Sequence, residues 1–149
     1  MLHVLLVLHL VLFVFSFAFT AGLGILQSRV ARSGDAQKIH TVFSACRPLS
    51  MAGGFAWLLT ALVGVGLAQM AGYSLTDPWL DYSYAGFAVL MAVGFGFHAP
   101  HQAKVIAESA NGMTPELAAT LKSPVAPLAG VISALAVIAI VWFMSSRMG

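Results

Sequence analysis

Histidine is the residue type in this sequence that offers the most chemistry, because a neutral imidazole binds haem iron or a transition metal through one ring nitrogen. There are five: His3, His9, His40, His98 and His101. Ion pumps and proton-coupled transporters usually have ionisable residues inside the membrane. In this sequence no Asp, Glu, Lys or Arg lies near the middle of a long apolar segment. The sequence also has no phosphate-binding loop, nucleophile elbow or zinc-protease motif. We therefore assign no catalytic residue and consider binding by histidine.

His3 and His9 are the candidate cofactor-binding residues, because both belong to the first apolar segment. His9 has no polar neighbour in the sequence, and an unsatisfied polar group in lipid costs several kcal/mol. It is either a haem or metal ligand or, as we favour, a neutral imidazole bonded to a nearby backbone or hydroxyl group. On one helix, His3 and His9 lie ~9 Å apart and point ~120° away from each other, so they cannot share one iron.

His98 and His101 are the candidate metal ligands, because residues three apart share one face of an unbroken helix. Pro100 lies between them and removes a backbone donor, which kinks helices. A metal site could form from both histidines with His40 or Cys46, which we place on the same side of the membrane. The alternative is a pair of interfacial histidines that meet headgroups and water.

The depths at which the histidines lie in the membrane argue against a haem held by two histidines of one chain. We place His9 and His98 on opposite sides of the membrane centre, with ~16 Å between them along the helix axes. That separation exceeds the reach of two side chains toward one iron. Haem b with one histidine and another ligand remains open.

Copper is the other cofactor that the residues allow. Met1, Met70, Met144 and Met148 are all expected at the end of the molecule that carries His3. Thioether and imidazole ligands suit Cu(I). The alternative is that these methionines fill gaps in apolar packing.

Four apolar segments must position these residues. The chain has 149 residues, of which 60% are hydrophobic and 8% charged, whereas soluble domains are ~25% charged. Four stretches without Asp, Glu, Lys or Arg are each long enough for the ~20 residues that cross a bilayer. We predict an all-α, up-and-down bundle of four transmembrane helices forming one integral membrane domain over 1–149. The spans are expected at 2–26, 48–70, 82–102 and 125–146.

The first span is expected to be a retained helix and not a cleaved signal peptide. No Lys or Arg precedes it, and it is longer than the apolar core of a signal peptide. Orientation follows from the basic residues, which mark cytoplasmic connections. Four lie in the first connection and two in the third, whereas the second carries only Asp77 and Asp81. We therefore expect both termini outside the cytoplasm, and an aromatic belt at that side formed by Tyr73, Trp79, Tyr82, Tyr84 and Trp142.

Two short interfacial helices are expected in the cytoplasmic connections. Asp35 can cap a helix over 36–46 that leads into Pro48, and Thr114 can cap a helix over 115–122. Small residues also recur at four-residue spacing, which lets helices approach closely in lipid. Alternatively, Gly and Ala are simply common in membrane helices. The two clearest stripes are Ala88, Ala92 and Gly96 in the third span and Ala126, Gly130 and Ala134 in the fourth.

Several short motifs together resemble a known family pattern. They are Leu-His-Val-Leu at 2–5, Gly-Asp at 34–35, Asp-Pro-Trp-Leu at 77–80, Pro100, and Phe-Met at 143–144. The whole chain resembles a family of uncharacterised four-helix bacterial integral membrane proteins. That family is similar, more distantly, to the CopD copper-resistance proteins and the HemJ-type protoporphyrinogen oxidases.

The resemblance implies a multi-pass protein of the bacterial cytoplasmic (inner) membrane. The first-helix histidine of HemJ-type proteins corresponds to His3, but their proline-arginine segment after that helix is replaced by Leu-Gln-Ser-Arg at 26–29. The CopD likeness implies copper handling at the outer face through His3.

We favour a non-catalytic membrane subunit or assembly partner that associates with itself or other membrane subunits. A haem- or metal-binding redox protein and a copper-handling protein are the alternatives. The net charge of +2, scattered along the chain, argues against a nucleic-acid partner.

Overall fold

A computed structural model describes residues 1–146, and over this range the chain consists of helices and the turns that join them. The helices are α1 (Leu2–Ala31), α2 (Ala36–Met70), α3 (Pro78–Val93), the π-helix η1 (Gly94–His98), α4 (Ala99–Ser109), α5 (Pro115–Lys122) and α6 (Val125–Ser145). Four helical units are long and apolar enough to cross a membrane: Leu2–Ala31, Ala36–Met70, Pro78–Ser109 and Pro115–Ser145. The predicted all-α fold with four spanning helices is therefore confirmed.

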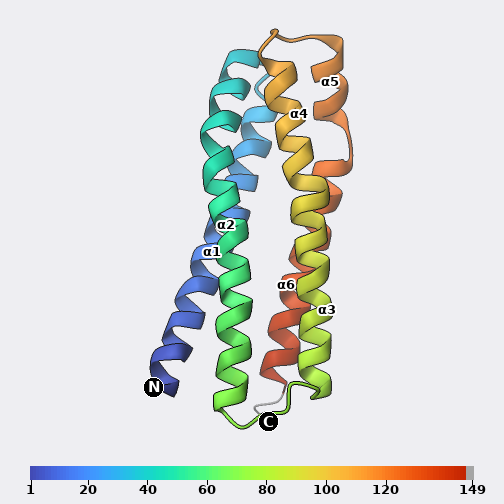
Figure 1. The fold of residues 1–149 in the computed structure, drawn as a ribbon. Coiled ribbons are helices and arrows are strands. Elements are labelled where there is room, and N and C mark those ends of the chain that lie inside the picture. The colour runs from blue at the N-terminus through green and yellow to red at the C-terminus, as the bar shows by residue number, and fades with distance from the viewer. Residues whose placement is uncertain (147–149) are drawn as a thin grey trace.

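The four units run up and down as two antiparallel pairs (Figure 1). Helix α1 packs on α2, and α3 packs on α6, while α4 contacts both α2 and α5. The N-terminus, the α2–α3 connection and the end of α6 lie at one end of the bundle (Figure 1). The α1–α2 and α4–α5 connections lie at the opposite end, which we call the basic end because most Lys and Arg residues of the chain are there.

Two buried clusters hold the bundle together. At the basic end, Ile39 of α2, Val105 of α4 and Leu117 of α5 are each 0% exposed and pack together with Phe43. In the middle of the bundle, Trp57 of α2 packs with three residues of the α3–α6 pair: Leu90, Ala136 and Val137. The first cluster fixes the position of α4 and α5, and the second joins the two helical pairs.

Helix α2 differs from the sequence prediction around Pro48. The cap is confirmed, because the Lys38 backbone N–H donates to Asp35 Oδ1 at 3.0 Å. The separate interfacial helix over 36–46 is not, because α2 continues through Pro48 to Met70. One buried face runs across the proline at spacings of three, four and seven residues, and this packing outweighs the loss of one backbone hydrogen bond. Its members are Ile39, Phe43, Cys46, Gly53, Trp57 and Thr60.

The other predicted elements are close to the observed ones. Helix α5 matches the expected 115–122, with the Leu117 N–H donating to Thr114 Oγ1 at 3.2 Å. The third span begins at Pro78 and extends to Ser109, beyond the expected 82–102. The earlier start is explained by Pro78, because proline favours the first turn of a helix, where its missing N–H would have no partner. The expected kink at Pro100 takes the form of the π-helix η1.

The π-helix has an identifiable cause. The Ala99 N–H bonds to the Gly94 carbonyl, five residues back. In an α-helix the ring of Pro100 would clash with the Gly96 carbonyl, four residues back, and the wider π turn relieves that clash. The π-helix lies where the long third unit changes partners. Helix α3, before it, packs on α6, and α4, after it, packs on α2 and α5.

The small-residue stripes do not pack the third and fourth spans against each other. Ala88, Ala92 and Gly96 are exposed, and a Cβ added at Gly96 would meet no atom within 4 Å. Gly130 is likewise open. The close approach of α3 and α6 occurs instead at Gly86, where an added Cβ would lie 2.9 Å from Ile140 Cγ1.

Candidate functional site

His9 is held between α1 and α2. Its Nδ1 lies 2.9 Å from the Thr60 carbonyl oxygen. Because a carbonyl only accepts, Nδ1 must carry the hydrogen and donate it, and the lone pair then lies on Nε2. The ring lies against Gly64, where an added Cβ would come within 2.8 Å of His9 Cε1. The glycine therefore provides the space that the imidazole occupies.

Hydroxyl groups continue this polar contact along the same interface. Ser16, which is 0% exposed, donates to the Leu12 carbonyl at 2.7 Å and lies 3.5 Å from Thr60 Oγ1. Thr60 donates to the Ala56 carbonyl at 2.8 Å. Each hydroxyl thus donates to a carbonyl of its own helix, and the two oxygen atoms lie close together inside the membrane-spanning pair. Serine and threonine in otherwise apolar segments are the sequence signal that could have pointed to this interface.

The structure separates His9 from the other histidines. His9 packs on Gly64, whereas Phe95 of η1 packs over Gly54, with its Cζ 3.4 Å from an added Cβ. Ten residues of α2 lie between these two points, or ~15 Å along its axis. The structure therefore agrees with the depth argument against one haem shared by His9 and His98. His3 is exposed in the first turn of α1.

The expected third metal ligands are engaged elsewhere. His40 Nδ1 lies 3.1 Å from the Ile106 carbonyl oxygen and 3.2 Å from Ser109 Oγ, which ties α2 to α4. Cys46 is buried in the α2 face. Among residues 1–146, no group of three His, Cys, Asp or Glu side chains is arranged to hold a metal ion. The structure thus does not bring His98 and His101 together with a third ligand, and a metal site at these two histidines is still a prediction.

The structure describes three of the four methionines proposed as copper ligands. Met1 and Met70 are 90% and 47% exposed, and Met144 is half-buried. Met148 lies outside the described residues. A copper site at this end of the bundle is still a prediction.

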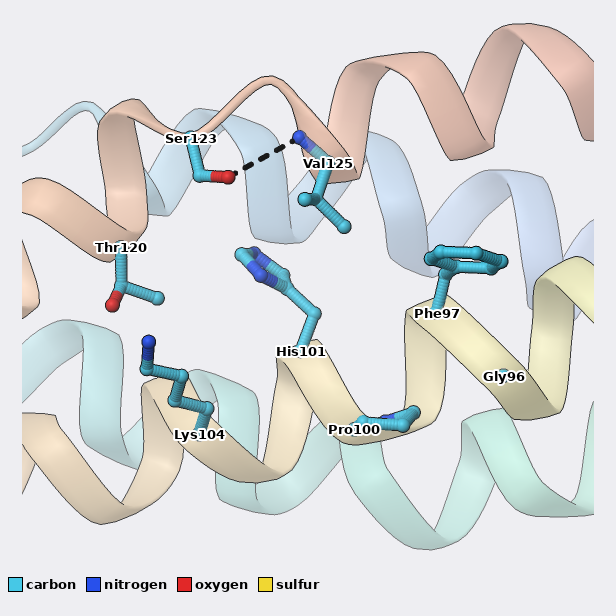
Figure 2. A pocket seen from close by; sticks show the side chains of 8 residues that line it. All are labelled: Gly96, Phe97, Pro100, His101, Lys104, Thr120, Ser123 and Val125. Carbon is cyan, nitrogen blue, oxygen red and sulfur yellow. Dashed lines mark hydrogen bonds between the residues drawn. The ribbon is translucent and has the colours of Figure 1, made fainter.

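His101 lines a hollow of about 290 Å³ at the basic end, between α4 and the α5–α6 turn. Figure 2 shows its ring reaching across toward that turn, with the Lys104 ammonium group beside Thr120. Ser123 Oγ, on the far wall, accepts a hydrogen bond from the Val125 N–H at 3.3 Å. The remaining lining is apolar or without a side chain: Gly96, Phe97, Pro100 and Val125.

A second hollow of about 370 Å³ continues from the first, and the two share Lys104, Thr120 and Ser123. Glu108 and Glu116 line the second hollow. Lys104 Nζ lies 3.8 Å from Glu108 Oε1, one helical turn away. The sequence placed α5 correctly but gave no sign that Thr120 and Ser123 face His101, because that contact depends on how α5 folds back onto α4.

The comparisons with known proteins identify a family and no activity. No curated protein and no solved structure matches the sequence. The family described as "Predicted integral membrane protein (DUF2269)" matches residues 3–148. With a match over nearly its whole length and four helices that can span a membrane, the chain belongs to this family of integral membrane proteins.

Proposed function

We propose that the protein is a non-catalytic subunit or assembly partner of the bacterial cytoplasmic membrane, which acts through helix association with its own copies or with other membrane proteins. The observation that carries this proposal is the exposed stripe of Ala88, Ala92 and Gly96 on the third unit. Apolar exposure alone gives no drive toward association in lipid, because the hydrocarbon is equally apolar. A stripe of small residues does, because it lets a partner backbone come close.

Helix α1 supports the same function. Of its thirty residues only Ser16 is buried, and α1 packs chiefly on α2. Its other faces carry large exposed apolar side chains, such as Val7, Val11 and Val14. The helix is therefore anchored on one side and open to lipid or another helix on the rest.

The test is association in bilayers. In vesicles, copies labelled with donor and acceptor fluorophores are expected to show energy transfer that falls as the lipid-to-protein ratio rises. Ala92→Leu should weaken that association, because the larger side chain separates the backbones. Ala52→Leu, an exposed alanine on α2, is the matched control.

A wild-type chain that is monomeric in bilayers and purifies from its native membrane without a partner would contradict the proposal. Equal association of the Ala92 and Ala52 variants would contradict the role of the stripe.

A haem- or metal-binding redox protein is the second candidate, and the geometry of His9 favours it. Metal-ligating histidines usually donate their other ring N–H to a carbonyl or carboxylate, as His9 does to Thr60. His9 would bind haem b through Nε2, and the second ligand would come from another chain or a small molecule. A Soret band in the purified protein, lost in His9→Ala, would support this function; a band lost in His3→Ala instead would support the kinship to HemJ-type proteins.

Copper handling is the third candidate, through His3 and a distant kinship to CopD proteins. Copper found by elemental analysis and lost in His3→Ala would favour it. Metal that is lost in His98→Ala or His101→Ala instead would point to a site at the basic end.

A further inference from the structure

The two hollows at the basic end are lined in an ordered way. The part of the first hollow nearest η1 has Phe97 and Val125, which are 56% and 36% exposed. Next come His101 and Lys104, and the second hollow adds Glu108 and Glu116. The lining thus changes from apolar to cationic to anionic.

This order follows the depth of the membrane. Residues 82–103 and 125–146 contain no Asp, Glu, Lys or Arg, whereas Lys104 and Lys122 begin the charged region. The hollows therefore cross the boundary between hydrocarbon and headgroups, with their apolar part on the hydrocarbon side. A phospholipid presents its acyl chain, its phosphate and its terminal headgroup in the same sequence.

The Thr120 hydroxyl is open to the hollows and is not engaged by the described residues. Thr120 is 6% exposed and lines both hollows. Among residues 1–146, no hydrogen bond engages its side chain, and Figure 2 shows that side chain beside the Lys104 ammonium group. The hydroxyl is therefore free to donate a hydrogen bond to a ligand in the hollow. A phosphate oxygen between Thr120, Lys104 and His101 would accept it.

The charges select among headgroups. One lysine faces two glutamates, so a headgroup with a net negative charge gains no net attraction. Glu108 Oε2 is buried without a hydrogen-bond partner among the described residues, and a primary ammonium group has three N–H donors for it. A choline headgroup has none, and the quaternary ammonium groups that proteins recognise are held by aromatic side chains, which the second hollow lacks.

We propose that the hollows between α4 and the α5–α6 turn bind a phospholipid with an ethanolamine headgroup. Lys104, His101 and Thr120 contact its phosphate, Glu108 and Glu116 its ammonium group, and Phe97 and Val125 the start of an acyl chain. This binding goes beyond helix association and is measured on each chain, so the failure of one proposal leaves the other intact.

The experiment is lipid binding to the delipidated full-length protein, followed by native mass spectrometry. The probes are dioleoyl-phosphatidylethanolamine, -phosphatidylcholine and -phosphatidylglycerol at equal concentrations, with glycerophosphoethanolamine as a competitor without acyl chains. We expect the ethanolamine lipid to bind about tenfold more tightly than the other two, since one charge-assisted hydrogen bond is sufficient for that ratio. The competitor should displace it weakly, because it lacks the apolar contacts.

Glu116→Gln should reduce the preference for ethanolamine toward one, because it removes a charge that faces the ammonium group. Lys104→Ala should weaken the binding of all three lipids, because it contacts the phosphate that they share. Lys38→Ala, which removes an exposed lysine outside the hollows, should leave both the affinity and the preference unchanged. Glu116 is exposed, so its variant tests the site even if the Lys104 variant does not fold. Equal binding of the three lipids, or tighter binding of phosphatidylglycerol, overturns the proposal. Displacement by the competitor at the concentration of the lipid itself shows a soluble phosphoethanolamine site and overturns the lipid assignment.

Discussion

At the scale of single residues, Gly64 has the least room for a side chain among the glycines that the structure describes. His9 fills the space that a side chain at Gly64 would need, and its hydrogen bond to the Thr60 carbonyl holds the ring there. This contact joins α1 to α2 where α1 has almost no other buried group. We therefore expect Gly64 to be much less tolerant of substitution than Gly66, which lies on the same helix.

Gly64→Ala should lower the free energy of unfolding in detergent or bicelles by about 1–3 kcal/mol, the usual cost of overpacking. The new Cβ would displace the imidazole and break its bond to Thr60. Gly66→Ala is the matched control, because an added Cβ there meets nothing within 4 Å. It should be neutral or stabilising by up to about 1 kcal/mol.

A double variant separates the clash from other effects of the alanine. In His9→Ala the space beside Gly64 is empty, so adding Gly64→Ala should cost little more. If Gly64→Ala is as destabilising without His9 as with it, the contact described here is not the reason.

At the scale of elements, the α2 helix shows how packing overrides a local signal. Pro48 predicts a helix end, but the buried face from Ile39 to Thr60 crosses it without a break. The proline still removes the hydrogen bond that a residue at position 48 would donate to the Ser44 carbonyl. The helix therefore holds an unused backbone acceptor that a substitution can satisfy.

Pro48→Ala should raise the free energy of unfolding, by up to about 3 kcal/mol, because it restores that donor. Pro127→Ala is the control, since Pro127 lies in the first turn of α6, where the first intrahelical acceptor is Pro124 and is used by Leu128. It should have little effect. Equal gains for both variants would mean that the restored hydrogen bond is not the cause. A loss of stability in Pro48→Ala would mean that α2 needs a break at residue 48.

At the scale of the whole molecule, the sequence predicts where the four spans lie but not which side of each helix faces lipid. Lipid demands an uninterrupted apolar helix, so four uncharged stretches predict four spans directly. Lipid-facing and core-facing residues are both apolar, however, so periodicity does not show that Ala92 faces outward while Gly86 meets Ile140. The partner of His9 was equally hidden, because it is a backbone carbonyl 51 residues away and every residue has one.

The fold also makes the orientation testable. Both connections that carry basic residues lie at one end, and the acidic α2–α3 connection lies at the other with the N-terminus (Figure 1). Because basic connections stay on the cytoplasmic side, we expect the basic end inside the cell and Ser74 outside.

In a Cys46→Ser background, a membrane-impermeant maleimide should label Ser74→Cys in spheroplasts of an expressing bacterium. Asn111→Cys, which is equally exposed in the α4–α5 connection, should react only after the membrane is opened. The reverse pattern would invert the protein and place the two hollows of the basic end on the outer side of the membrane. Labelling of both sites in intact spheroplasts would contradict a single orientation, and with it the use of basic residues to position this bundle.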